Sequence, residues 1–199
     1  MTSAAQPLIV ELDTVLSRAT ATWRNTTLRR LADLFLVDAQ AYSDDQVAVF
    51  DDVMCRLIDK ADRRTLADLS TRLAQVQNAP VRVVATLARN LDIAIAGPLL
   101  EKSNVLTDAD LIEIADREKK EPGALALIAA RVQLSEPVTD VLVRRGNAAL
   151  ARKLIDRVDA PLSESSFARL VTSVENDKDL ATAIAKREDL PAELSLIHI

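Results

Sequence analysis

Residues with the chemistry for catalysis are scarce in this sequence. It contains a single histidine, His198, one residue from the end of the chain, and a single cysteine, Cys55. Ser–His–Asp and Cys–His catalysis require an imidazole held beside the nucleophile, and zinc sites require a cluster of cysteine and histidine ligands. The three glycines are too few for a glycine-rich phosphate-binding loop. The sequence therefore predicts no catalytic, cofactor-binding or metal-binding residues, and no enzyme.

Cys55 and two acidic pairs have structural interpretations. Cys55 shares a helical stripe with apolar residues, so we expect a small buried side chain, because a reactive thiol needs a nearby cation to lower its pKa. Asp44-Asp45 and Asp51-Asp52 could serve acid–base catalysis or bind a divalent ion, but adjacent residues of a helix point in different directions. Asp44-Asp45 also suits a first helical turn, where the dipole favours negative charge. We interpret both pairs as structural.

The candidates for anion binding are three arginine pairs: Arg29-Arg30, Arg63-Arg64 and Arg144-Arg145. An architecture that aligned the pairs could form an anion-binding edge. The favoured alternative is that they are solvated, or that they balance a C-terminal helix dipole, as Arg144-Arg145 would before Gly146. Arg131 and Arg187 recur at matching places of an internal repeat near a helix end, which favours a structural role.

The few aromatic residues offer one candidate for an interface. Trp23 is the only tryptophan and lies between two predicted helices, the second of which we expect Asn25 to cap. A tryptophan in such a place is either an anchor for a partner or a buried contact. The three phenylalanines lie in helical stripes and are predicted to belong to the core: Phe35, Phe50 and Phe167.

Composition favours an all-α protein. Of the 199 residues 49% are hydrophobic but only 3% are aromatic, so the core must consist of aliphatic side chains. The net charge of −5 argues against a nucleic-acid binder, which usually carries a basic face. The N-terminal residues lack the basic region and long apolar run of a signal peptide, and no apolar run reaches about 18 residues, so we expect no membrane association. A lone cysteine fits a reducing compartment, and we predict a cytoplasmic protein.

Helix-start signals divide the chain. We predict a disordered N-terminus over residues 1–7 and a helical segment over 8–42. Ser43-Asp-Asp-Gln46 has the pattern of a capping box, and Thr107-Asp-Ala-Asp110 opens another helix. Asn78-Ala-Pro80 predicts a helix capped by the asparagine, with the proline in its first turn.

The second half of the chain repeats itself. Residues 106–143 align without a gap with residues 162–199, cap on cap and core position on core position, and a looser copy begins at Ser43. Such self-similarity indicates a helical solenoid. We predict a right-handed α-solenoid of short HEAT-like helices without a sheet, in a single domain over 8–199. Each unit is expected to hold three short helices, or two and a capped connector. The predicted units are residues 43–105, 106–161 and 162–199, and the unfinished third unit suggests the N-terminal part of a longer protein.

An ordered set of motifs supports this fold by resemblance. The motifs are Phe50-Asp-Asp-Val-Met-Cys-Arg-Leu-Ile58, Asn78-Ala-Pro80, Ala94-Ile-Ala-Gly-Pro-Leu-Leu100, Leu106-Thr-Asp-Ala-Asp-Leu-Ile112, Ile128-Ala-Ala-Arg131 with Leu134-Ser135, and Arg187-Glu-Asp-Leu-Pro191. Together they resemble an alphaproteobacterial family catalogued as a domain of unknown function, number 2336 in that series. The resemblance implies helical repeats related to HEAT and leucine-rich-variant repeats. It brings no established activity and no site residues.

The absence of chemistry and the repeat pattern favour a non-catalytic protein–protein interaction or scaffolding module. The partner would be another protein or a second copy of the chain, and the helices over residues 8–37 are the candidate for a homodimer contact. The alternative is a solenoid that binds nucleic-acid backbones, which would require the arginine pairs to converge. A ligand-binding or enzymatic groove is the third and least favoured class.

Overall fold

The computed structural model describes residues 20–117, 122–173 and 178–191, and these contain eleven helices and no strand. The all-α prediction is confirmed for this part of the chain. His198, the segment 1–7 and the first predicted helix lie outside the described residues. The helices are α2 (Ala21–Val37), α3 (Asp44–Ile58), α4 (Arg63–Leu73), α5 (Val81–Ala88), α6 (Ile93–Lys102), α7 (Asp108–Ala115), α8 (Pro122–Ile128), α9 (Glu136–Arg145), α10 (Ala148–Asp156), α11 (Glu164–Ser173) and α12 (Lys178–Ala185).

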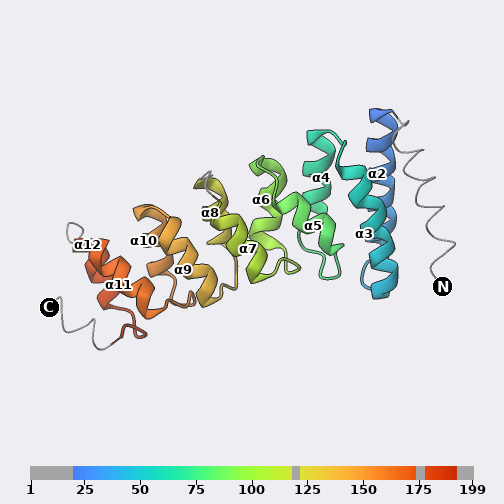
Figure 1. The fold of residues 1–199 in the computed structure, drawn as a ribbon. Helices are drawn as coiled ribbons and strands as arrows, with labels where there is room; N and C mark the ends of the chain where they lie inside the picture. The colour runs from blue at the N-terminus through green and yellow to red at the C-terminus, as the bar shows by residue number, and fades with distance from the viewer. Residues whose placement is uncertain (1–19, 118–121, 174–177, 192–199) are drawn as a thin grey trace. The chain divides into compact units, whose positions relative to one another are not determined.

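The helices belong to two compact units. Unit 1 is Met1–Leu99 with Ser103–Leu106, and unit 2 is Leu100–Lys102 with Thr107–Ile199. In unit 1, α2 packs on α3 and α4, and α5 packs on the same two helices (Figure 1). In unit 2, α9 contacts α7, α10 and α11, while α8 packs on α7 and α12 on α10. The predicted single repeat domain and its unit boundaries stay predictions.

Aliphatic side chains form both cores, as the composition requires. In unit 1, Phe35 is fully buried. Its ring stacks on that of Tyr42, with 5.8 Å between the centroids, and meets the ring of Phe50 edge to face at 5.2 Å. Phe50 is only half-buried. In unit 2, Phe167 is fully buried in a cluster with aliphatic residues of α10, α11 and α12. Each core therefore contains few aromatic side chains and consists mainly of aliphatic ones.

Local caps follow the predicted signals. Ser43 Oγ accepts the N–H of Gln46, and Gln46 Oε1 accepts the N–H of Ser43, which completes the capping box of α3. Thr107 and Asp110 form the same reciprocal pair at the start of α7. Each box satisfies backbone donors that the first helical turn leaves without an intrahelical partner.

The predicted cap of α5 is wrong. Asn78 does not cap the helix but donates to the carbonyl oxygens of Ala39 and Tyr42, and Pro80 occupies the N-cap position without a side-chain hydrogen bond. The buried carboxylate of Asp51, on α3, accepts the backbone N–H groups of Arg82 and Val83 at 3.1 and 2.8 Å. The cap of α5 is therefore supplied from a different helix.

The first described helix also begins earlier than predicted. Thr20 is its N-cap and accepts the N–H of Trp23 at 3.2 Å, so Trp23 lies in the first turn of α2. Asn25 lies inside the helix and accepts the N–H of Asp62. Trp23 is 43% exposed, which excludes the alternative of a buried contact.

The predicted unit 106–161 holds four short helices, α7 to α10, instead of three. At the aligned positions, nevertheless, both residues of each pair are buried: Leu111 and Phe167, Ile114 and Leu170, and Ile128 and Ile184. The helices of this region have seven to ten residues, so two helix pairs fit where the sequence suggested one larger unit.

Candidate functional site

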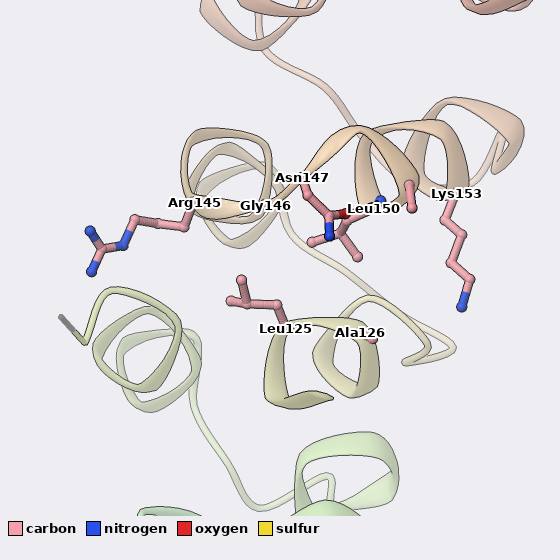
Figure 2. A pocket seen from close by; sticks show the side chains of 8 residues that line it. Leu125, Ala126, Arg145, Gly146, Asn147, Leu150 and Lys153 are labelled. Carbon is pink, nitrogen blue, oxygen red and sulfur yellow. Dashed lines mark hydrogen bonds between the residues drawn. The ribbon is translucent and has the colours of Figure 1, made fainter. Parts of the chain in front are cut away.

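A hollow lies between α8 and the corner that joins α9 to α10. It has a volume of about 240 Å³ and is lined by Leu125, Ala126, Arg145, Gly146, Asn147, Ala149, Leu150 and Lys153. Figure 2 shows Leu150 and Asn147 facing Leu125 of α8, with Arg145 and Lys153 on opposite sides. We call this site the α8–α10 hollow.

A tight corner shapes the hollow. α9 ends at Gly146, whose N–H bonds to the Leu142 carbonyl, and α10 begins at once with Asn147 as its N-cap. A Cβ atom on Gly146 would lie 2.5 Å from the Leu142 oxygen and 2.7 Å from Leu150 Cδ2. Both distances are far inside van der Waals contact. Only glycine therefore allows α10 to start this close to α9.

We expect Gly146→Ala to destabilise the protein by about 1–3 kcal/mol, because the added methyl overpacks the corner against backbone and Leu150. Thermal or urea denaturation measures the change. Gly123→Ala is the matched control, since Gly123 is exposed in α8 and alanine favours helix there. Equal stability of the two variants would contradict the close packing at Gly146.

The polar groups around the hollow are hydrogen-bond donors. Asn147 Oδ1 accepts the N–H of Leu150 at 3.0 Å, which leaves its amide Nδ2 as a donor. Lys153 makes no hydrogen bond or ion pair with any described residue, whereas Arg145 donates to the carbonyls of Asp116 and Arg117. None of the lining residues is acidic. The hollow thus combines an apolar floor with a cationic, donor-rich rim in a chain whose net charge is −5.

The three arginine pairs engage partners within their own units. Arg29 donates to Thr65, and Arg63 pairs with Asp92, whose pKa the hydrogen bond from Arg63 holds below the usual aspartate value. Arg144 and Arg145 lie in the last turn of α9 and both pair with Asp116. Among the described residues, each pair therefore has at least one member committed to an internal contact.

Arg131 and Arg187 form a series with a third arginine that the sequence did not indicate, Arg157. Each lies just beyond the C-terminus of a helix and reaches back to carbonyls at the end of an earlier one. Arg131 donates to Leu100 O, and Arg157 donates to the carbonyls of Ala129 and Arg131. We call these three residues the arginine series.

The last member of the series is the most deeply engaged. Arg187 donates to the carbonyls of Leu154, Ile155, Arg157 and Ala160. Its guanidinium also pairs with Asp189, whose pKa this hydrogen bond lowers, and lies 5.7 Å from the centroid of Phe167. Burial alone lowers the pKa of Arg131, despite the opposing effect of Asp108. The series satisfies carbonyls that helix ends leave without intrahelical partners.

Cys55 is half-buried beside an acid instead of a cation. Its Sγ lies 3.8 Å from Asp51 Oδ1, and burial, followed by the charge of Asp51, raises the pKa of the thiol to about 11. The opposing influence of Arg82 is smaller. A thiol in this environment is protonated at neutral pH and is a poor nucleophile.

We expect Cys55 to react slowly with a disulfide reagent at pH 8, about tenfold slower than a free cysteine. The rise in pKa from 9.0 to about 11 reduces the thiolate fraction about 100-fold, and the higher nucleophilicity of a more basic thiolate offsets part of that loss. The rate should still rise with pH beyond 9. Stopped-flow labelling against free cysteine measures it, and a plateau near pH 8 would contradict the raised pKa.

Among residues 20–117, 122–173 and 178–191, no three His, Cys, Asp or Glu side chains gather as they would around a metal ion. None of the described helices combines the length and the apolar character needed to cross a membrane. The pair Asp51-Asp52 diverges as expected of helix neighbours: Asp51 is buried under α5, while Asp52 is exposed and pairs with Arg82.

These features describe an all-α fold of short helices in which buried polar groups such as Asp51, Ser70 and Arg187 bond to the backbone of the chain. Comparison with protein families matches residues 95–197, just over half of the chain, to the family described as "Uncharacterised protein conserved in bacteria (DUF2336)". The chain belongs to this bacterial family, as its motifs suggested; the restriction to alphaproteobacteria and the HEAT-like repeats stay predictions. Comparisons with curated proteins and with solved structures gave no match.

Proposed function

We propose that this chain is a non-catalytic protein–protein interaction or scaffolding module, built as a HEAT-like α-solenoid. The partner is another protein or a second copy of the chain. The observation that carries the proposal is a stripe of large apolar side chains left exposed on α2. Helical solenoids use long surfaces of this kind to bind other proteins.

The arginine series supports the repeat architecture. Arg157 bonds to the carbonyl of a residue 26 positions earlier, Arg131, and Arg187 bonds to one 30 positions earlier, Arg157. Equivalent arginines at nearly constant spacing, each after a short helix pair, are what stacked repeats would produce. The helix pair is then the repeating unit, and the self-similarity of the sequence spans two such pairs.

The α2 stripe consists of Trp23, Leu34 and Val37, which are 43%, 56% and 76% exposed. Leu34 and Val37 follow Trp23 after about three and four helical turns, so the three side chains share one face. The opposite face, with Leu28, Ala32 and Phe35, is fully buried in unit 1. Tryptophan is enriched at protein interfaces, and apolar side chains left exposed on one face are a feature of binding surfaces.

The experiment compares the parent protein with a Trp23→Ser/Leu34→Ser/Val37→Ser variant. Affinity capture from the bacterial cells, with mass spectrometry, detects protein partners, and light scattering detects a homodimer. We expect a stoichiometric partner or a dimer for the parent and its loss for the variant. Val132→Ser is the control, because Val132 is 87% exposed but lies outside the stripe. A monomer that captures no protein would contradict the proposal.

Nucleic-acid binding is the weaker alternative. It would need several free arginines on one surface, whereas Arg29, Arg63 and Arg145 already bind internal partners. Capture of nucleic acid that elutes as salt rises would favour this alternative over the scaffold. A groove that used Cys55 as a nucleophile finds even less support, because burial and the charge of Asp51 raise the pKa of this half-buried thiol to about 11. We also propose a cytoplasmic location, on the ground that Cys55 is free.

A further inference from the structure

We infer that the α8–α10 hollow receives an acidic, leucine-bearing segment of a partner protein: an apolar side chain would enter the hollow, and neighbouring carboxylates would meet Lys153 and Asn147. The inference rests on the proposed interaction function and names the chemistry of one partner surface. It is independent of the α2 stripe, which belongs to the other compact unit.

The floor of the hollow favours an apolar group. Leu125 and Leu150 are 7% and 6% exposed, so they present packed aliphatic surface instead of mobile side chains. Ala126 and Ala149 add small side chains that leave the space open. The volume of about 240 Å³ is below the range of roughly 300–1,000 Å³ that holds drug-sized ligands, but it accommodates one or two aliphatic side chains.

The rim favours negative charge. Lys153 has no ionic partner among the described residues, and its stem extends beside the floor (Figure 2). The Asn147 amide offers a second donor, since its oxygen is occupied by the Leu150 N–H. Arg145 lies on the other side, where the Asp116 carboxylate offsets its charge and the carbonyls of Asp116 and Arg117 accept its hydrogen bonds, so Lys153 is the cation left to meet a partner. The lining offers hydrogen-bond donors and contains no carboxylate. The ligand group that matches it is therefore an anion with several hydrogen-bond acceptors.

A peptide segment satisfies both requirements together. The hollow lies at a helix corner and is open to solvent. The net charge of the chain, −5, repels an acidic partner over the rest of the surface. A local cationic rim therefore selects where such a partner can approach. The floor then fixes the position by burying a leucine-sized side chain.

The test uses the full-length protein and a fluorescent peptide with leucines at helical spacing among glutamates, followed by anisotropy. A second peptide carries lysines in place of the glutamates. We expect the acidic peptide to bind and the basic one not to bind. Lys153→Glu should lower the affinity for the acidic peptide about tenfold. Ala149→Phe, which fills the hollow from an exposed position, should lower this affinity at least as much.

Lys60→Glu is the matched control, because it makes the same charge change at an exposed lysine of unit 1. Circular dichroism verifies that all variants are folded. Equal binding of both peptides, or binding unchanged by Lys153→Glu and Ala149→Phe, would overturn the inference. So would displacement of the peptide by hexanoate at comparable concentration, which would indicate a small carboxylic acid. Self-association abolished by Lys153→Glu would overturn it too, in favour of a second copy of the chain.

The two proposals fail separately. If cellular partners are captured through the α2 stripe but the acidic peptide does not bind, the interaction function stands and this inference falls. If neither partner nor peptide binds, both fall. Binding of the peptide with loss in both hollow variants supports the inference whatever the α2 stripe contacts.

Discussion

Arg187→Met is expected to lower the free energy of unfolding by about 3–5 kcal/mol, the range for removing one partner of a buried charge network. Methionine keeps much of the side-chain volume but donates no hydrogen bond. The carbonyls of Leu154, Ile155, Arg157 and Ala160 would lose their donors in a site where the Arg187 side chain is only 3% exposed. The Asp189 carboxylate would also lose its cation.

Urea denaturation followed by circular dichroism measures this effect. Arg187→Lys should recover only part of the loss, because an ammonium group cannot place donors at four carbonyls and a carboxylate in the fixed geometry of a guanidinium. Arg169→Met is the control, since Arg169 is exposed on the adjacent helix α11. A loss at Arg187 no larger than that at Arg169 would show that water replaces the guanidinium.

The second large effect is expected for Asp51→Ala, at about 1–3 kcal/mol. The substitution removes the acceptor for the N–H groups of Arg82 and Val83, and the start of α5 has no cap of its own to replace it. The same change should accelerate the labelling of Cys55, because the charge of Asp51 contributes to the raised pKa of that thiol.

Asp52→Ala separates this cap from general charge effects. Asp52 precedes Val53 on the same helix but is exposed, and its ion pair with Arg82 lies in solvent, where such pairs contribute little. We expect Asp52→Ala to leave both the urea midpoint and the labelling rate of Cys55 nearly unchanged. If the two aspartate variants behaved alike, Asp51 would not be the cap of α5.

Sequence reasoning succeeded where the determinants are local. The caps at Ser43 and Thr107 each depend on residues within one turn, so their patterns are sufficient to place the starts of α3 and α7. The start of α2 is local as well, but the sequence indicated Asn25 as its cap, whereas Thr20 caps the helix and Trp23 lies in its first turn.

The features that the sequence did not reveal depend on contacts across the fold. Asp51 caps a helix that starts 31 residues later, and no spacing rule predicts this pairing. No pattern in the sequence distinguishes Arg157 from an exposed arginine, because its role depends on the carbonyls of Ala129 and Arg131, which lie beside it only in the folded chain. The α8–α10 hollow depends on the close approach at Gly146, which only the packed corner explains.

The arginine series has a consequence for how unit 2 comes apart. Arg131 holds the carbonyl of Leu100, Arg157 holds that of Arg131, and Arg187 holds that of Arg157. Arg131 and Arg157 thus each donate from the guanidinium to an earlier segment and accept, through the backbone carbonyl, from the next arginine. When the last helix pair, α11 and α12, loosens, the carbonyls of the preceding pair lose the donors that Arg187 provides. Local opening should therefore spread to that preceding pair instead of remaining at one end. Amide hydrogen exchange should therefore show α8 and α10 opening as one cooperative block rather than as independent hairpins.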